Sequence, residues 1–187
     1  VYHEHINFFN VKSMNELTKR ANLKLHHVEK KPIHGTSYLF VIKIKSSSKK
    51  VLKILKKEKY LNQSYYKKWA KDCYTIIKKI QKKVQVLNKN YIIIGYGAAA
   101  KANTFLNFSN IKLDYIIDDN KFKQNKFCPG SKIQIKSRKL LKKLKKNIYI
   151  MPLAWNFYKE IKNKVKMIRP KKDDRFILCF PKFKIEK

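Results

Sequence analysis

The sequence predicts an α/β fold in which a Rossmann-like parallel sheet domain follows a helix and two strands that end another domain. Three observations predict it. The uncharged run at residues 92–94 is typical of a strand buried on both faces of a parallel sheet. Gly95, Gly97 and Ala100 follow with the GxGxxA spacing of a strand–turn–helix junction. From Tyr91 onward, strand and helix patterns alternate along the chain.

Residues 1–46 are predicted to be the end of a larger sheet domain. Apolar residues at helical spacing predict a helix over 11–21, with Asn22 as its C-terminal cap. Two strands are expected after it, at 23–28 and 38–44. The chain begins with Val1 rather than methionine, and we expect it to be a fragment whose N-terminal part is missing.

Residues 47–90 are predicted to form a helical connection, with helices over 51–61 and 65–87. In the second helix, apolar residues repeat at three-to-four spacing and lysines fill the opposite face. These apolar residues are Trp69, Cys73, Ile76, Ile77, Ile80, Val84 and Leu87. We interpret them as a core stripe that covers a sheet, rather than as a partner-binding surface.

Residues 91–187 are predicted to form a three-layer parallel α/β domain. Further strands are expected at 113–117, 148–151 and 176–179, the last of these being the final strand of the sheet. Helices are expected at 104–110, 136–146 and 157–165.

The formal net charge of +34 raises the possibility of a nucleic-acid binder. Nearly all of this charge is lysine, and it is spread along the whole chain. The arginines, which are better suited to bidentate phosphate and base contacts, are Arg20, Arg138, Arg169 and Arg175. We therefore expect no specific nucleic-acid partner, only weak and salt-sensitive adhesion.

Cys73, Cys128 and Cys179 are far apart and form no CxxC pair, so neither a disulfide framework nor a zinc site is predicted. A reducing, cytoplasmic compartment fits this usage. The longest uncharged run, residues 147–158, is too short to span a bilayer, and no membrane partner is expected.

The glycine-rich junction is a candidate phosphate site. Gly95 would make the tight turn, Gly97 would allow close approach to a ligand, and Ala100 would let the helix pack on the strand. The amides of residues 98–101 would then open a helix and point at an anion, with the Lys101 ammonium group nearby. A plain tight turn is the alternative.

Further candidate residues follow later strands. Asp118 and Asp119 come a little over twenty residues after Gly95, where dinucleotide folds place a carboxylate on a ribose hydroxyl, although such acids also cap turns. Trp155 and Asn156 follow another strand and suit stacking on, and hydrogen bonding to, a base or sugar. Ordinary packing is the alternative for Trp155.

Tyr2, His3, Glu4 and His5 concentrate proton-transfer groups at the start of the chain. The pattern lacks HExxH spacing and nearby ligands, so no metal site is predicted here. Histidine has a pKa near neutrality, so His5 or His3 could act as a general base. The alternative is that these histidines are exposed at a chain terminus and have no catalytic role. His34 lies in a polar loop and is a weaker candidate.

Taken together, these segments resemble the C-terminal region of S-adenosylmethionine-dependent sugar C-methyltransferases. The resemblance rests on five ordered motifs: YHEH, PIHGTS, GYGAAAKANT, DDNKFKQNKFCPG and LAWNF. Thr36, Ala102 and Asn125 stand where the family commonly has glycine. That family methylates the carbon next to the ketone of a nucleotide-diphosphate 4-keto-deoxysugar.

The resemblance implies that this sequence is part of a longer chain whose domains have separate functions. Residues 1–46 would be the remnant of a class I methyltransferase domain, and residues 91–187 the complete C-terminal domain. The S-adenosylmethionine-binding strands and the zinc-binding cysteines would lie in the absent N-terminal part. This chain would therefore bind no zinc and would not methylate a substrate alone.

The resemblance also implies roles for individual residues. His5 would remove the proton next to the ketone, Tyr2 and Glu4 would orient the base or the sugar, and the enolate carbon would attack the methyl sulfonium. Tyr2 and His34 would stabilise the enolate oxygen. The substrate-binding residues would be Gly95, Gly97, Ala98, Ala99, Lys101, Asn103, Thr104, Asp118, Trp155 and Asn156.

Two other functions compete with this interpretation. The GxGxxA spacing together with Asp118 or Asp119 suits a fragment of an NAD(P)-dependent oxidoreductase. The charge of +34 suits a nonspecific nucleic-acid binder.

Overall fold

The computed structural model describes residues 7–32 and 37–187, which divide into two compact units between Asp72 and Cys73. The N-terminal unit contains α1 (Val11–Arg20), β1 (Lys24–Lys31), β2 (Ser37–Lys43), α2 (Lys49–Lys57) and the short 3-10 helix η1 (Glu58–Tyr60). The long helix α3 (Gln63–Asn88) starts in this unit and continues into the second. No described helix has both the length and the apolar composition of a membrane span.

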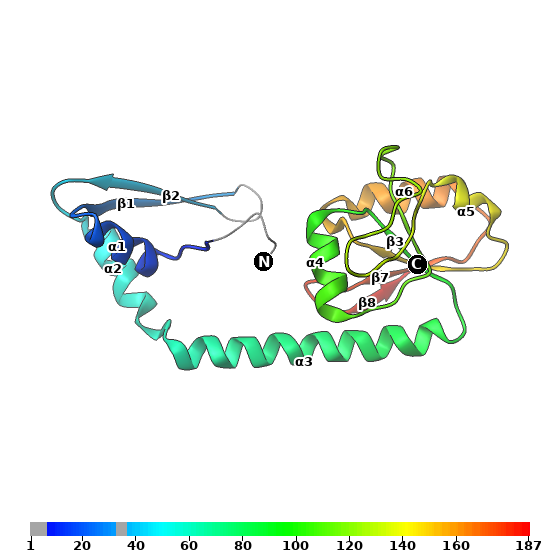
Figure 1. The fold of residues 1–187 in the computed structure, drawn as a ribbon, viewed down its shortest axis with the longest axis horizontal. Helices are drawn as coiled ribbons and strands as arrows, with labels where there is room; N and C mark the ends of the chain where they lie inside the picture. Colours follow the sequence, from blue (N-terminus) through cyan, green and yellow to red (C-terminus); the bar gives the residue numbers. More distant parts are fainter. Residues whose placement is uncertain (1–6, 33–36) are drawn as a thin grey trace. The chain divides into compact units, whose positions relative to one another are not determined.

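The N-terminal unit is an antiparallel hairpin of β1 and β2 with α1 and α2 packed against it (Figure 1). Asn10 begins α1 with a reciprocal capping box to Ser13. The C-cap residue of α1 is Ala21, and Asn22 directly after it has the left-handed conformation, with φ of 55°, that commonly ends a helix. The predicted helix and strands are therefore confirmed, and their sheet has two strands among the described residues.

The C-terminal unit is built on a six-stranded sheet in the order β5-β4-β3-β6-β7-β8. Its strands are β3 (Ile93–Tyr96), β4 (Tyr115–Ile117), β5 (Ile135–Lys136), β6 (Tyr149–Pro152), β7 (Arg175–Leu178) and β8 (Lys184–Glu186). The first five in this order are parallel, and β8 pairs antiparallel with β7. The prediction that the strand at 176–179 ends the sheet is wrong, because β8 follows it.

Helices cover both faces of this sheet (Figure 1). Along β3, Ile93 packs toward α3 and α4 (Ala100–Ser109), whereas Ile94 packs toward α5 (Lys139–Lys143) and α6 (Tyr158–Ile168). The same alternation places Ile116 and Ile117 of β4 on opposite faces. The three-layer Rossmann-like architecture is confirmed, but the predicted helix over 136–146 is short because β5 occupies its first residue.

The stripe along α3 is only partly buried. Ile80 and Val84 are buried against the sheet, whereas Trp69 and Ile76 are 56% and 53% exposed. At about 1.5 Å per residue, a helix of 26 residues is far longer than strands of three or four residues. Only the last turns of α3 can therefore cover the sheet, and the prediction of a continuous core stripe is wrong.

The strand order reverses between β3 and β6, since the chain runs outward from β3 through β4 and β5 and then returns to β6. In open α/β sheets this switch point is where ligands bind, outside the carboxyl ends of the strands. The loops after β3, β4 and β6 carry the candidate residues of this unit.

Candidate functional site

Gly95 and Gly97 differ in role from the prediction. Gly95 lies within β3, and a Cβ there would be 2.6 Å from the Leu153 side chain and 3.0 Å from that of Leu113. Its small size therefore serves core packing. Gly97 has φ of +100° and makes the turn into α4. The predicted assignment of the tight turn to Gly95 is wrong.

The close approach at Gly97 is to protein rather than to open space. A Cβ on Gly97 would lie 2.7 Å from the Ala154 Cβ, in the loop after β6. The Tyr96 carbonyl also accepts hydrogen bonds from the amides of Leu153 and Ala154, at 2.9 and 3.2 Å. The loops after β3 and β6 are thus joined directly, and no nucleotide can lie between them at this depth.

The small residue that seats α4 on the sheet is Ala102 rather than Ala100. Ala102 is buried in the core, whereas Ala100 is exposed. The reason is the helical period, which turns the third residue of α4 inward and the first two outward. The third small residue of the GxGxxA spacing therefore does not have the packing role predicted for it.

Asp118 joins the loops after β3 and β4. Its carboxylate accepts hydrogen bonds from the amide of Ala98 at 2.7 Å and from the amide of Asn120 at 2.8 Å. The Lys123 ammonium group lies 3.5 Å from the same carboxylate and donates to the Ala98 carbonyl at 2.8 Å. Asp118 therefore acts as a turn cap, which was the alternative to a ribose contact, and the Ala98 amide is already engaged.

The first turn of α4 is what remains of the predicted anion site. Ala99 is the N-cap residue, and no side chain among the described residues caps this helix. Lys101 is exposed beside this end, where the partial positive charge of a helix favours anions. The Thr104 hydroxyl donates to the Ala100 carbonyl at 3.2 Å, and Asn103 Oδ1 is buried with no hydrogen-bond partner in the described structure.

Asp119 is also engaged within the protein. It accepts a hydrogen bond from the Tyr96 hydroxyl at 3.1 Å and one from the Lys164 ammonium group at 3.1 Å. Burial, with a contribution from Asp119, raises the pKa of Tyr96 to about 12. Hydrogen bonds to Glu160 and Asp119 raise the pKa of Lys164. Tyr96 and Lys164 belong to this cluster without having been singled out from the sequence, because nothing in their local pattern separates them from core and surface residues.

Trp155 lies at the carboxyl end of β6, in the 3-10 helix η2 (Trp155–Phe157). Its ring packs edge-on against Phe180 with centroids 5.5 Å apart, and Phe105 of α4 packs on the same Phe180 ring at 5.3 Å. Ordinary packing, the alternative for Trp155, therefore accounts for its half-buried position. Asn156 beside it is exposed.

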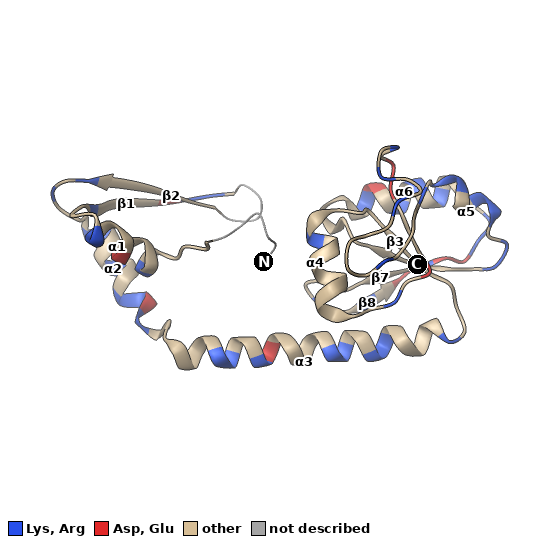
Figure 2. Cartoon of the chain, in the orientation of Figure 1, with Lys and Arg blue, Asp and Glu red and all other residues tan. Residues whose placement is uncertain are grey.

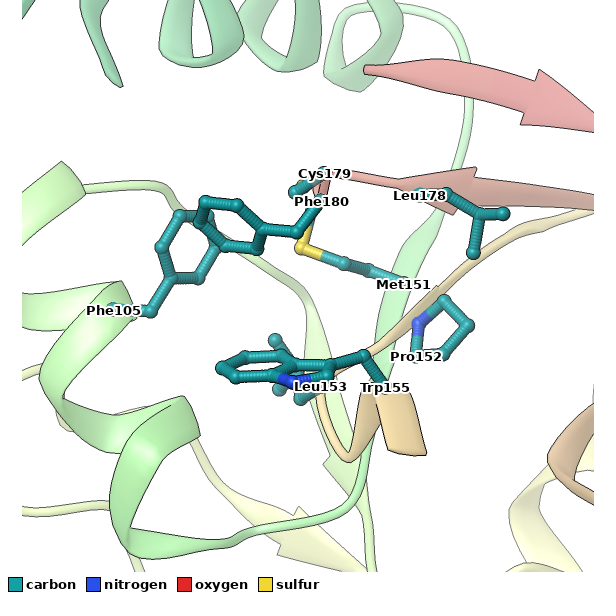
Figure 3. Close-up of a pocket in the computed structure, with 8 residues that line it drawn as sticks. All are labelled: Phe105, Met151, Pro152, Leu153, Trp155, Leu178, Cys179 and Phe180. Atoms are coloured by element: carbon teal, nitrogen blue, oxygen red, sulfur yellow. The ribbon is translucent and has the colours of Figure 1, made fainter. Parts of the chain in front are cut away.

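These rings border a small apolar cavity of about 20 Å³ (Figure 3). It is lined by Phe105, Met151, Pro152, Leu153, Trp155, Leu178, Cys179 and Phe180. Burial raises the pKa of the Cys179 thiol to about 12, so this thiol stays protonated. The cavity has room for about one water molecule, and it is far too small for a base or a sugar.

Tyr2, Glu4, His5 and His34 lie outside the described residues, and their roles stay predictions. Within 7–32 and 37–187, no group of three or more His, Cys, Asp and Glu side chains is placed to hold a metal ion. Lysines and arginines are distributed over α3, α5, α6 and the loops (Figure 2).

The profile of the C-methyltransferase C-terminal domain family matches residues 32–181, which is most of the chain. The chain belongs to this family. The resemblance drawn from the five motifs is thereby confirmed at the level of the family. No curated protein sequence matches this C-methyltransferase domain.

S-adenosylmethionine, which the family implies, does not fit the β3–α4 turn of this C-methyltransferase domain. Ala154 fills the space in front of Gly97, and both acids after β4 are bound to protein groups rather than open to a ribose. The same contacts count against NAD at this turn, because a carboxylate in this position binds the ribose 2′-hydroxyl of NAD.

Proposed function

We propose that the enzyme to which this domain belongs methylates the carbon next to the ketone of a nucleotide-diphosphate 4-keto-deoxysugar. In this proposal, the unit after Asp72 binds the nucleotide diphosphate of the substrate. The observation that supports methyl transfer to carbon as the reaction is membership of the C-methyltransferase family. The uncapped first turn of α4 at the switch point of the sheet supports the placement of the diphosphate.

The engaged acids favour one kind of nucleotide. In dinucleotide folds, the acid after the second strand binds the ribose 2′-hydroxyl. Here Asp118 caps a turn and Asp119 binds Tyr96 and Lys164, so no carboxylate is left for that hydroxyl at this strand end. A 2′-deoxyribose nucleotide has no such hydroxyl. We therefore propose that the substrate is a dTDP-linked sugar rather than a sugar linked to a ribonucleoside diphosphate.

His5, Tyr2 and Glu4 are proposed to handle the proton next to the ketone, since a base with a pKa near neutrality suits that step. S-adenosylmethionine would supply the methyl group, and no residue of this chain is assigned to it.

Titration calorimetry with dTDP and dTDP-4-keto-6-deoxyglucose tests nucleotide binding by this chain. Both ligands should bind the wild type, and NAD should not. Lys101→Gln should weaken dTDP binding by up to about fivefold, because an exposed ion pair contributes about 0.2–1 kcal/mol. Lys112→Gln, an exposed lysine beyond the other end of α4, is the matched control and should bind like the wild type.

Binding of NAD without binding of dTDP would support the oxidoreductase alternative. Equal loss in both variants would mean that general charge, rather than the end of α4, attracts the nucleotide. No response to either nucleotide would remove nucleotide binding from this unit.

A further inference from the structure

The loop after β4 presents an aromatic side chain to solvent. Phe122 is 85% exposed, and it lies in a turn over residues 121–125 where polar residues are usual. The exposed lysines Lys121 and Lys126 lie on the same loop. An aromatic ring among cations is the combination that binds a nucleotide, since the ring stacks on the base and the cations attract phosphate.

The backbone around Phe122 is fixed by hydrogen bonds. The Phe122 amide donates to Asn120 Oδ1 at 2.9 Å, and the amide of Asn120 donates to Asp118 at 2.8 Å. On the other side, the side-chain amide of Gln124 donates to the Asp118 carbonyl at 3.0 Å. These hydrogen bonds fix the backbone of the turn, and the Phe122 ring extends from it into solvent.

This turn is attached to the proposed diphosphate site. The Lys123 ammonium group, one residue from Phe122, donates to the Ala98 carbonyl at 2.8 Å, just before α4 begins. On the opposite side of the same β3–α4 turn, Ala154 packs against Gly97 and leads to Trp155. The start of α4 thus lies between a loop that carries Phe122 and a loop that carries Trp155.

We propose that Phe122 is the stacking surface for the nucleobase of the nucleotide sugar. This inference rests on the proposed function, and it sets the orientation of the bound substrate along the carboxyl edge of the sheet. The base lies over the loop after β4, the diphosphate lies at the start of α4, and the sugar extends toward Trp155 and Asn156. The nucleoside end then occupies the side of the second strand, as in other folds with this strand order.

Calorimetric titration of dTDP and of pyrophosphate into the wild type and three variants tests the stacking role. Phe122→Ala should weaken dTDP binding by about fivefold or more, since a stacked base contributes about 1–3 kcal/mol. It should leave pyrophosphate binding unchanged, because pyrophosphate has no base. Phe122→Trp should restore dTDP binding. Phe127→Ala, which removes a 60% exposed ring from the same loop, should bind both ligands like the wild type.

The outcomes separate the two proposals. If the wild type binds dTDP and Phe122→Ala binds it equally well, the stacking role is overturned and nucleotide binding stands. If Phe122→Ala weakens dTDP and pyrophosphate equally, the ring acts on the loop rather than on the base, and the stacking role is again overturned. A wild type that binds no dTDP overturns both proposals.

Discussion

Glu186 connects the last strand of the sheet to the helix that covers it. The Lys184 ammonium group bonds one of its oxygens, and the Tyr158 hydroxyl donates to the other at 2.6 Å. These two hydrogen bonds hold the pKa of Glu186 at about 2, below its ordinary value of 4.5. A carboxylate with a lowered folded-state pKa stabilises the fold above its unfolded-state pKa, and this stabilisation is lost as the pH falls through the folded-state pKa.

Glu186→Gln should therefore lower the stability of the protein at pH 6, and the difference from the wild type should shrink between about pH 4.5 and about pH 2. Urea unfolding followed at several pH values measures this difference. Tyr158→Phe is the matched variant, because it removes one hydrogen bond and should move the loss to higher pH. A Glu186→Gln difference that stays constant from pH 6 to pH 2 would exclude the carboxylate as its source.

At the level of single residues, the sequence located the β3–α4 junction better than it assigned roles to its residues. The spacing correctly marked a strand–turn–helix junction, because only glycine fits at Gly95 and Gly97. It could not show that Leu153 and Ala154, more than fifty residues later, occupy the space in front of the glycines. Whether Asp118 faces a ligand or the Ala98 amide likewise depends on tertiary contacts.

At the level of elements, one buried arginine joins three of them. Arg169 ends α6, and its guanidinium group donates to the Asp174 carboxylate at 2.6 Å. It also donates to the carbonyls of Leu141 in α5 and of Lys146 before β6, each at 2.7 Å. Asp174 in turn accepts the Ile148 amide at 2.9 Å. The planar guanidinium group satisfies carbonyls that would otherwise be buried without partners.

Arg169→Met should cost about 3–5 kcal/mol of unfolding free energy, since it leaves the Asp174 carboxylate buried and unpaired. Arg169→Lys should recover only part of this loss, because an ammonium group cannot reproduce the fork of donors. Urea unfolding measures both. Arg175→Met is the control, because that side chain is 46% exposed and lies 3.9 Å from its partner, and it should change stability by less than about 0.5 kcal/mol. Similar losses of unfolding free energy in Arg169→Met and Arg175→Met would contradict a special role for the buried pair of Arg169 and Asp174.

The sequence predicted α1 well from its helical periodicity, and β3 well from its uncharged run followed by glycines. β5 and β8 were missed because two- and three-residue strands carry no readable alternation. They exist because neighbouring strands supply hydrogen-bond partners. The opposite error occurred in α3, where the periodicity is real but Trp69 extends beyond the sheet.

At the level of the whole molecule, the two units have separate cores of different size. Residues 73–187 contain the complete six-stranded sheet with buried clusters on both faces. Among the described residues of the N-terminal unit, the buried cluster consists of Val11, Leu25, Val28 and Val51. A larger buried apolar surface supports independent folding, whereas a small core is marginal.

A fragment of residues 73–187 should therefore fold alone and unfold cooperatively in urea, whereas a fragment of residues 1–72 should show a weak, broad transition. Circular dichroism during urea unfolding measures both transitions. A cooperative 1–72 fragment beside an unfolded 73–187 fragment would contradict this distribution of stability.

The short edge strands of the sheet have a consequence for the molecule at high concentration. β5 offers two residues and β8 three at the margins of the C-terminal sheet, and Lys136 and Lys184 lie on these strands. A neighbouring copy would find almost no unpaired backbone to extend, and it would meet like charge where it tried. Polymerisation by addition of strands to the C-terminal sheet is thus disfavoured by geometry as well as by repulsion.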